Sequence, residues 1–264
     1  MKPSVLYPYR RAINNLFCRK EQIATFHTGR CGSTVLAYML NDHSKIYWDS
    51  EPFEPYMKHS KNKDKKEFVE NVLDWSRHRE VSKIYGFETK YLPHQHLSHK
   101  CINMDIEDYI IFLREINFSK FIVIHRKNYL RRVISAEVGR QTNRWHSKKD
   151  VTSPIKVTIN INYFVEGVYQ GPILKLFRIR DENFNRLKKL LSHGDALFLT
   201  YENDILDNPR VAYSKVCDFI GVNDETPKIK LRRTNPFNYE NLITNYEEVR
   251  AALIDTKYSW MLND

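Results

Sequence analysis

The segment Thr28-Gly29-Arg30-Cys31-Gly32-Ser33-Thr34 has the residue types of a phosphate-binding loop. Glycines let the backbone approach an anion closely, and successive amide groups can then point into the loop. Arg30 adds a planar, permanently charged donor, while Ser33 and Thr34 place hydroxyls in the first turn of a following helix, whose N-terminus also attracts anions. The same residues also suit an ordinary strand-to-helix turn. A Walker loop would end in Gly-Lys-Ser/Thr, and this segment does not, which argues against an ATPase or a kinase.

A second basic site follows the apolar run at 121–124. Arg126 and Lys127 lie at the end of this predicted strand, and Ser135 lies on the helix expected after it. A cation and a hydroxyl that converge in this way can bind a phosphate. Arg126 is the preferred cation, because a guanidinium can hold two phosphate oxygens at once. Taken alone, a basic patch after a strand more often faces solvent, so this segment gains weight from the loop upstream.

Together the two segments resemble those of sulfotransferases that use 3'-phosphoadenosine-5'-phosphosulfate (PAPS). Bacterial and Golgi-type members commonly read Arg-Ser-Gly-Ser/Thr-Thr where this chain has the residues from Arg30 to Thr34, so that only Cys31 departs. The resemblance assigns the loop to the 5'-phosphosulfate, with Arg30 also serving catalysis, and Arg126 and Ser135 to the 3'-phosphate. The family separates this cation from its serine by eight positions. Lys127 has that spacing and Arg126 is one position further, so both remain candidates.

The resemblance also implies a general base, because transfer of a sulfuryl group to an alcohol requires the acceptor's proton to leave. In several branches a glutamate at the end of the second strand resembles that base, and Glu51 lies 21 positions after Arg30, as in tyrosylprotein-type members. Glu54, also followed by proline, is the competing carboxylate. Cytosolic members use a histidine instead, and this chain offers His94, His96, His99 and His146. A metal site at His94 and His96 would need a further ligand that the sequence does not indicate, so no metal is expected.

Two later segments resemble the rest of the family pattern. The segment 196–204, followed by Asn208-Pro209, is similar to the last strand and its exit. The basic segment 228–236 is similar to a late loop that closes over the 3'-phosphate, which implies binding roles for Arg232 and Arg233. A run of lysine and arginine is more commonly a solvated face.

The elements that must position these residues alternate between strand and helix. We expect strands at 22–27, 45–48, 84–89, 121–124 and 196–201, and helices at 33–40, 61–79, 106–116, 128–140, 209–220 and 245–250. The segment 148–158 is expected to be a loop, and 163–191 a helix bent or interrupted at Gly171-Pro172. This pattern predicts a three-layer α/β fold with a mainly parallel sheet flanked by helices, similar to the P-loop NTPase-like fold of sulfotransferases.

Composition sets the remaining expectations. The 264 residues, 42% of them hydrophobic, are expected to form a single domain over 1–264. A net charge of +10 favours an anionic partner, and four scattered cysteines indicate neither a disulfide framework nor a zinc site. The N-terminal segment lacks the continuous apolar core of a signal peptide, and no run reaches membrane-spanning length. We therefore expect a cytoplasmic protein without a transmembrane segment, for which peripheral contact with anionic membranes remains open.

The sequence thus predicts an enzyme that transfers a sulfuryl group from PAPS to a hydroxyl acceptor and releases 3',5'-ADP (PAP). The acceptor is not identified, and a carbohydrate, a lipid-linked glycan and a small metabolite all fit. A nucleotide-dependent phosphotransferase is the first alternative, but it would need a magnesium carboxylate and a triphosphate lysine. A non-catalytic nucleic-acid-binding protein is the second. It is disfavoured because no RRM, KH or zinc-finger pattern is present, so no nucleic-acid partner is expected.

Overall fold

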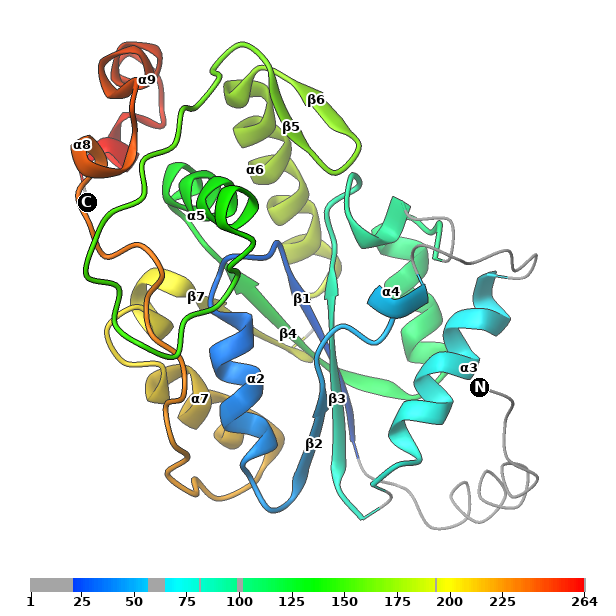
Figure 1. Cartoon of the computed structure of the whole chain (residues 1–264). Coiled ribbons are helices and arrows are strands. Elements are labelled where there is room, and N and C mark those ends of the chain that lie inside the picture. Colours follow the sequence, from blue (N-terminus) through cyan, green and yellow to red (C-terminus); the bar gives the residue numbers. More distant parts are fainter. Residues whose placement is uncertain (1–20, 57–64, 81, 99–101, 193, 264) are drawn as a thin grey trace.

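The computed structural model describes residues 21–56, 65–80, 82–98, 102–192 and 194–263. Within these residues five parallel strands form one sheet in the order β2-β3-β1-β4-β7 (Figure 1). The strands are β1 (Gln22–His27), β2 (Ile46–Asp49), β3 (Ile84–Lys90), β4 (Phe118–His125) and β7 (Ala196–Thr200). Because the strands are parallel, their carboxyl ends meet at one edge of the sheet, where ligands bind in open α/β folds.

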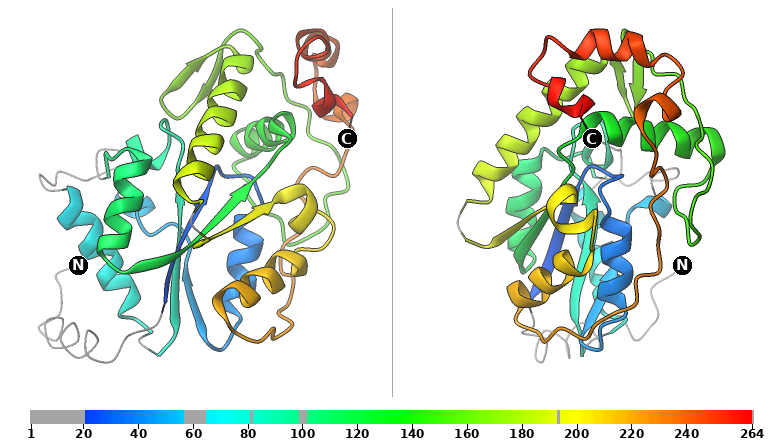
Figure 2. Two further views of the ribbon diagram at one scale, coloured as in Figure 1. Left: turned by 180° about the vertical axis from the view of Figure 1, so that it is seen from behind. Right: turned by 90° about the vertical axis from the view of Figure 1, so that its left-hand side faces the viewer.

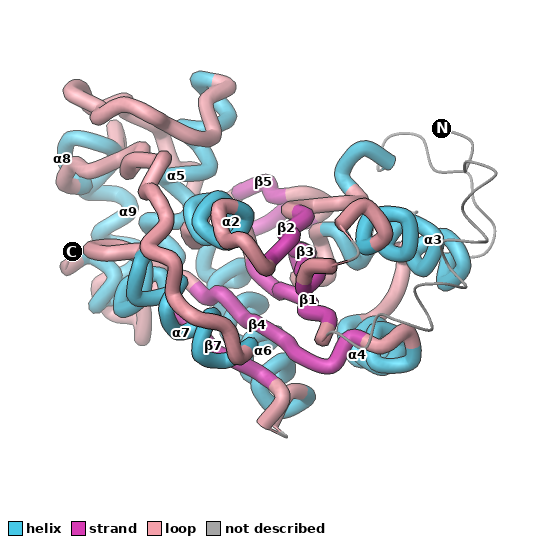
Figure 3. Tube along the Cα trace, turned by 90° about the horizontal axis from the view of Figure 1, so that it is seen from below, coloured by secondary structure: helices cyan, strands magenta, loops and turns pink. Residues whose placement is uncertain are grey.

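Helices cover both faces of the sheet (Figures 2 and 3). One face packs against α2 (Ser33–Asn41) and α7 (Arg210–Ile220), and the other against α3 (Lys65–Arg77) and α4 (Ile106–Glu115). Alternation along β4 decides which side chain goes where: Ile122 and Ile124 join the first core, and Phe121 and Val123 the second. The predicted three-layer α/β fold with a parallel sheet is confirmed.

A third apolar cluster lies beyond the carboxyl end of the sheet. It is formed by α5 (Tyr129–Thr142), α6 (Ile173–Leu190), α8 (Tyr239–Leu242) and α9 (Tyr246–Leu253). These helices stand above the strand ends in Figure 1. The short helical turns are η1 (Glu54–Tyr56), η2 (His96–Ser98), η3 (Tyr201–Ile205) and η4 (Ser259–Leu262). The carboxyl ends of the strands are therefore covered by α5, α6, α8 and α9.

Polar side chains set the predicted ends of two helices. The side chain of Asn128 accepts a hydrogen bond from the Arg131 amide (2.9 Å) and caps α5. The side chain of Asn208 accepts one from the Arg210 amide (3.1 Å) at the start of α7, and Gly221 ends that helix with a left-handed φ of 73°. The expected boundaries of α7 are confirmed.

The expectation of a helix throughout 163–191 is wrong in its first part. Residues Phe164–Glu166 (β5) and Tyr169–Gly171 (β6) form an antiparallel hairpin, and the helix starts only after Pro172. Gly167 turns the hairpin at a φ of 58°, and a Cβ built there would lie 2.1 Å from the His94 carbonyl oxygen. The short run of β-branched and aromatic residues around this glycine therefore favours a hairpin over a helical turn.

Two further expectations depend on the limits of the described residues. The predicted helix at 61–79 appears as α3, and residues 61–64 lie outside the described ranges. Among the helices that the structure describes, none is long and apolar enough to span a membrane.

Candidate active site

The loop after β1 holds three residues in the left-handed backbone region. Gly29, Arg30 and Gly32 have φ angles of 74°, 56° and 80°. At Gly32 a side chain is excluded, because a Cβ built there would lie 2.6 Å from Ile205 Cγ2. At Arg30, which has a side chain, this conformation costs about 1–2 kcal/mol. Strain of this kind is characteristic of ligand-binding loops, where the surrounding structure maintains it.

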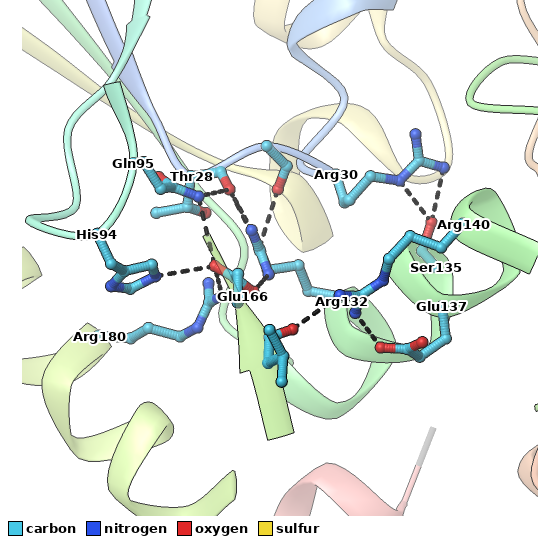
Figure 4. A network of polar contacts seen from close by, with 12 residues as sticks. Thr28, Arg30, His94, Gln95, Arg132, Ser135, Glu137, Arg140, Glu166 and Arg180 are labelled. Carbon is cyan, nitrogen blue, oxygen red and sulfur yellow. Dashed lines mark hydrogen bonds and ion pairs between the residues drawn. The ribbon is translucent and has the colours of Figure 1, made fainter. Parts of the chain in front are cut away.

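Arg132 on α5 fixes the loop through its carbonyl groups (Figure 4). Its Nε donates to the carbonyl oxygens of Thr28 and Gly29, both at 3.2 Å, and its Nη2 donates to Thr28 as well. Gln95, from the segment after β3, adds a hydrogen bond from Nε2 to the Thr28 oxygen (3.0 Å). The loop backbone is therefore held by side chains from two distant segments.

Glu166 on the β5–β6 hairpin balances the charge behind the loop. Its carboxylate pairs with Arg132, accepts hydrogen bonds from Arg180 Nη2 at 2.6 Å on both oxygens, and lies 3.0 Å from His94 Nε2. Arg180 is only 1% exposed. Burial alone would raise the pKa of Glu166, but the charges of Arg132 and Arg180 outweigh it and hold this pKa well below its usual range. We call Glu166, Arg132, Arg180 and His94 the Glu166 cluster.

Arg30 connects the two segments that were expected to bind phosphates. Its Nε and Nη2 donate to Ser135 Oγ at 2.9 and 2.8 Å (Figure 4). Nη1 donates to the Trp145 carbonyl oxygen (2.5 Å) and Nη2 to Thr234 Oγ1 (3.2 Å). The structure thus brings the loop, the α5 serine and the late basic segment to one place around a single guanidinium.

Arg126 also faces the loop. Its Nη1 donates to the Arg30 carbonyl oxygen (3.0 Å), and its guanidinium lies over the Tyr201 ring, 4.3 Å from the centroid. Lys127 is exposed, and its backbone amide is bound by the Glu202 carboxylate (3.0 Å). Of the two cations that the sequence left open, Arg126 is the one that the structure turns toward the loop.

Positive charge is crowded at this point. The pKa of Arg30 is lowered to about 10, first by burial and then by the charges of Arg126 and Arg132. Arg132 is paired with Glu166, whereas Arg30 and Arg126 form no ion pair with any carboxylate of the described residues. Two guanidiniums that form no ion pair among the described residues make this a site that favours an anion.

The remaining loop residues divide between core and surface. Cys31 is fully buried in the apolar cluster of α2 and α7, and this burial raises the pKa of its thiol to about 11. Its side chain serves packing, so any contact of Cys31 with a ligand must come from its backbone. Ser33 is buried and Thr34 half-buried at the start of α2.

Glu51 follows β2 and lies among three nitrogen atoms. Its Oε2 is 2.6 Å from Lys90 Nζ and 3.3 Å from His96 Nε2, and its Oε1 is 3.6 Å from His27 Nε2. Lys90 also borders the loop, since a Cβ built on Gly29 would lie 3.3 Å from Lys90 Cε. The lysine therefore stands between the phosphate-type loop and the predicted base.

The environment of Glu51 favours its ionised form. Burial by itself would raise the pKa of Glu51, but the hydrogen bond from His96 and the nearby positive charge of Lys90 hold it below its usual range. His96 accepts a hydrogen bond from the Lys90 amide at Nδ1 (3.2 Å). A neutral His96 therefore carries its hydrogen on Nε2 and donates it toward Glu51, so the ring acts here as a donor and not as a base.

Three residues of this group were not singled out by the sequence analysis: His27, Glu88 and Lys90. Glu88 is buried, and its Oε1 accepts a hydrogen bond from Trp48 Nε1 (3.0 Å). Burial raises the pKa of Glu88 to about 7, and the charge of Glu51 adds to the shift. Their position in the sequence could have identified them, because all three lie near the carboxyl ends of β1 and β3, which neighbour each other in the sheet.

His27, Glu51 and Glu88 have side-chain atoms close enough to suggest a metal site. The Gly29 amide, however, donates to His27 Nδ1 (3.1 Å), so a neutral His27 carries its hydrogen on Nε2. That nitrogen is the one that faces both carboxylates. A metal ligand needs the lone pair that this hydrogen occupies, so the group fits a proton better than a metal ion.

The competing candidates lie elsewhere or have other partners. Glu54 is exposed on η1, His94 belongs to the Glu166 cluster, and His146 is exposed. His99 lies outside the described residues.

The two cations of the late basic segment are both exposed. The Arg232 amide bonds to the Ser147 carbonyl oxygen (2.8 Å), and Arg232 Nε lies 3.7 Å from Asp150. Neither Arg232 nor Arg233 forms a described contact with the loop after β1, and it is Thr234 of this segment that reaches Arg30.

Comparison with known proteins gives matches among solved structures alone. No family model matches the sequence, and no curated protein matches it. The chain is similar to a sulfotransferase from Alicyclobacillus acidocaldarius at 12% identity and a TM-score of 0.46, over 92% of this chain and 94% of that one. It is also similar to the sulfotransferase domain from the curacin biosynthetic pathway, at 14% identity and a TM-score of 0.47, over 78% and 76%. Both structures are sulfotransferases. At this distance the likeness assigns no role to any residue of this chain.

Proposed function

We propose that this protein transfers a sulfuryl group from PAPS to a hydroxyl acceptor, with Glu51 as the general base. The observation that carries the proposal is the position of Lys90, which borders Gly29 of the loop and pairs with Glu51 at 2.6 Å. A group bound in the loop and a hydroxyl at Glu51 would thus be separated by about one side chain. An in-line transfer needs its donor and acceptor to be held close together, and a loop and a base on the two sides of one side chain can hold them so.

The donor site rests on the cations around the loop. Arg30 and Arg126 have no carboxylate partner among the described residues, and Ser135 and Thr234 supply hydroxyls beside Arg30. A nucleotide with phosphates at both its 5' and 3' positions would supply the missing negative charge. We assign the 5'-phosphosulfate to the loop from Thr28 to Thr34 and the 3'-phosphate to Arg126 and Ser135. Arg232 and Arg233 would have to approach the nucleotide from their exposed positions.

In the proposed step the acceptor oxygen forms a bond to sulfur while the bond between sulfur and the 5'-phosphate oxygen breaks. The acceptor's proton passes to Glu51, and the leaving 3',5'-ADP takes the electron pair. Arg30 and the loop amides stabilise the charge that develops on the phosphate. Lys90 would leave Glu51 for the sulfuryl oxygens, and loss of this charge would raise the basicity of the carboxylate when it must accept a proton.

The two alternatives are less well supported. A phosphotransferase would need oxygen ligands for Mg²⁺, but Glu51 is paired with Lys90 and His27 offers an N–H to both carboxylates. A nucleic-acid-binding protein would use exposed cations. Here Arg126 points toward the loop after β1, where its Nη1 bonds to the Arg30 carbonyl oxygen, and the Arg30 side chain is largely buried.

The test is a search for turnover. The protein would be incubated with radiolabelled PAPS and pools of carbohydrates, lipid-linked glycans and small alcohols, and label transfer would be measured together with release of 3',5'-ADP. Thermal shift with 3',5'-ADP, ATP-Mg and a single-stranded oligonucleotide separates the alternatives. We expect stabilisation by 3',5'-ADP; stabilisation by ATP-Mg or by the oligonucleotide alone would contradict the proposal.

A further inference from the structure

His27 connects the loop to the carboxylates. It is the last residue of β1 and only 1% exposed. The Gly29 amide donates a hydrogen bond to its Nδ1 (3.1 Å) from within the loop. On the other side of the ring, Nε2 lies 3.4 Å from Glu88 Oε2 and 3.6 Å from Glu51 Oε1. One imidazole is therefore hydrogen-bonded to the predicted donor site at one nitrogen and lies beside the predicted base, beyond hydrogen-bond distance, at the other.

The hydrogen bond from Gly29 fixes the tautomer of His27. A neutral imidazole has one N–H, and Nδ1 is already an acceptor, so the hydrogen is on Nε2. Among the described residues this buried nitrogen has no hydrogen-bond partner. It is a donor shared between two carboxylates and fully satisfied by neither, which makes it sensitive to small movements of Glu51.

Burial, together with nearby positive charge, keeps His27 neutral. Burial lowers its pKa to about 3, against the attraction of Glu51, and the positive charges of Lys90 and Arg132 act in the same direction as burial. Lys90 comes from β3 and Arg132 from α5, His96 lies nearby on η2, and Glu88 faces the ring from β3 as well. A neutral ring can orient a carboxylate without neutralising it, which leaves Glu51 able to accept a proton.

We propose that His27 is a positioning residue for the transfer, whose Nε2–H orients the Glu51 carboxylate while its Nδ1 is held by the Gly29 amide. This inference rests on the proposed function, because it is Glu51 as a base that needs orienting. It adds a coupling: a change in the loop at Gly29 shifts the ring, and the ring shifts the base. Without the Nε2–H, Glu51 would lose one of the groups that favour its ionised form, and the pKa of Glu51 would rise.

Two variants separate the two nitrogens of the ring. In His27→Asn the amide oxygen can occupy the position of Nδ1 and accept from Gly29, but nothing reaches the carboxylates. In His27→Gln the amide nitrogen can occupy the position of Nε2 and donate to Glu51. We expect His27→Asn to lose turnover by about 10–100-fold, the scale for an outer partner of a catalytic group. It should also move the acidic limb of the pH profile to higher pH.

His27→Gln should recover most of the turnover and the wild-type pH profile. Equal losses in both variants with an unchanged pH profile would overturn the proposal, since a merely structural histidine would behave in that way. Thermal unfolding of both variants controls for folding.

A second measurement requires no turnover. Nitrogen-15 NMR of wild-type protein labelled at histidine reports the tautomer, and carbon-13 NMR of the glutamate carboxyl groups reports their titration. We expect a neutral His27 with its hydrogen on Nε2, and a Glu51 titration that shifts to higher pH in His27→Asn. A hydrogen on Nδ1 would overturn the role of His27 even in an active enzyme. If instead the wild type shows no transfer from PAPS, the proposed function fails. The NMR result still shows whether His27 couples the Gly29 amide to the Glu51 carboxylate.

Discussion

Two half-buried carboxylates flank the same loop, and they are held in different ways. Glu166 is bound by two guanidiniums, one of which reaches both of its oxygens, and by His94. Glu51 has one short contact, with Lys90, and longer ones with His96 and His27. We call Glu51 and its neighbours His27, Glu88, Lys90 and His96 the Glu51 cluster.

The difference lies in what each carboxylate can still do. Rigid, planar guanidiniums saturate Glu166 and leave it no freedom to bind anything else. A lysine on a flexible stem can leave Glu51 when another anion arrives, and the His27 N–H can follow. A saturated carboxylate maintains the fold, and a carboxylate with exchangeable partners can take part in chemistry. The predictions below test this contrast.

The largest expected effect is on turnover in Glu51→Gln. Glutamine keeps the size and the hydrogen-bonding capacity of the side chain but cannot accept a proton, so turnover should fall by about 10²–10⁴-fold. Binding of 3',5'-ADP and the free energy of unfolding should change little. Glu54→Gln removes the same charge from an exposed position three residues away and serves as the matched control. If Glu54→Gln is the inactive variant, the base has been assigned to the wrong glutamate.

Glu166→Gln should reverse this pattern. It leaves Arg132 and Arg180 buried without their counter-charge, which we expect to cost about 3–5 kcal/mol of unfolding free energy. Urea denaturation of this variant and of Glu51→Gln gives the comparison. A Glu166→Gln protein as stable as the wild type would show that the two carboxylates do not differ in the way we describe.

The cations of the loop should divide between turnover and binding. Arg30→Ala should lower turnover more than it weakens 3',5'-ADP binding, because charge on the leaving group builds up during the reaction. The loss of transition-state stabilisation should be about 2.7–4 kcal/mol. Arg126→Ala should mainly weaken binding of 3',5'-ADP, by about 1.5–3 kcal/mol, the scale of a hydrogen bond to a charged group. Steady-state kinetics and calorimetry measure the two quantities. The opposite result would mean that the two phosphate sites are exchanged.

The smallest expected effect is a pH dependence of stability at Glu88. Its pKa is raised from 4.5 to about 7 in the folded protein. As pH rises through this interval the unfolded chain releases its proton first, so the contribution of Glu88 to the unfolding free energy is full below 4.5 and lost by about 7. Glu88→Gln should therefore gain stability relative to the wild type between pH 5 and pH 8, on the order of 1–3 kcal/mol. A difference that is constant across this range would contradict the raised pKa.

The sequence predicted the scaffold of the site well because local rules decide it. Gln22–His27 was expected as a strand, and the glycines after it predicted a tight loop into α2. Glu51 and Arg126 were selected through the resemblance to the sulfotransferase pattern, and each lies just after a strand whose carboxyl end reaches the site. Such residues can be placed from the order of the elements alone.

The partners of these residues could not be predicted, because long-range packing decides them. Lys90 is 39 positions from Glu51, and Ser135 is 105 positions from Arg30. The β5–β6 hairpin was missed for a related reason. In the hairpin, Glu166 pairs with Arg132 and Arg180, which come from α5 and α6. A helical pattern that is read along one segment contains no information on such pairs.

The most direct test of the central claim is calorimetry with 3',5'-ADP and with 5'-AMP, each with and without EDTA. The two nucleotides share the 5'-phosphate and differ only in the 3'-phosphate, which Arg126 and Ser135 are proposed to bind. We predict that 3',5'-ADP binds more tightly than 5'-AMP and that EDTA changes neither affinity. Equal affinities for the two nucleotides, or a strict requirement for magnesium, would contradict the assignment of this site to PAPS.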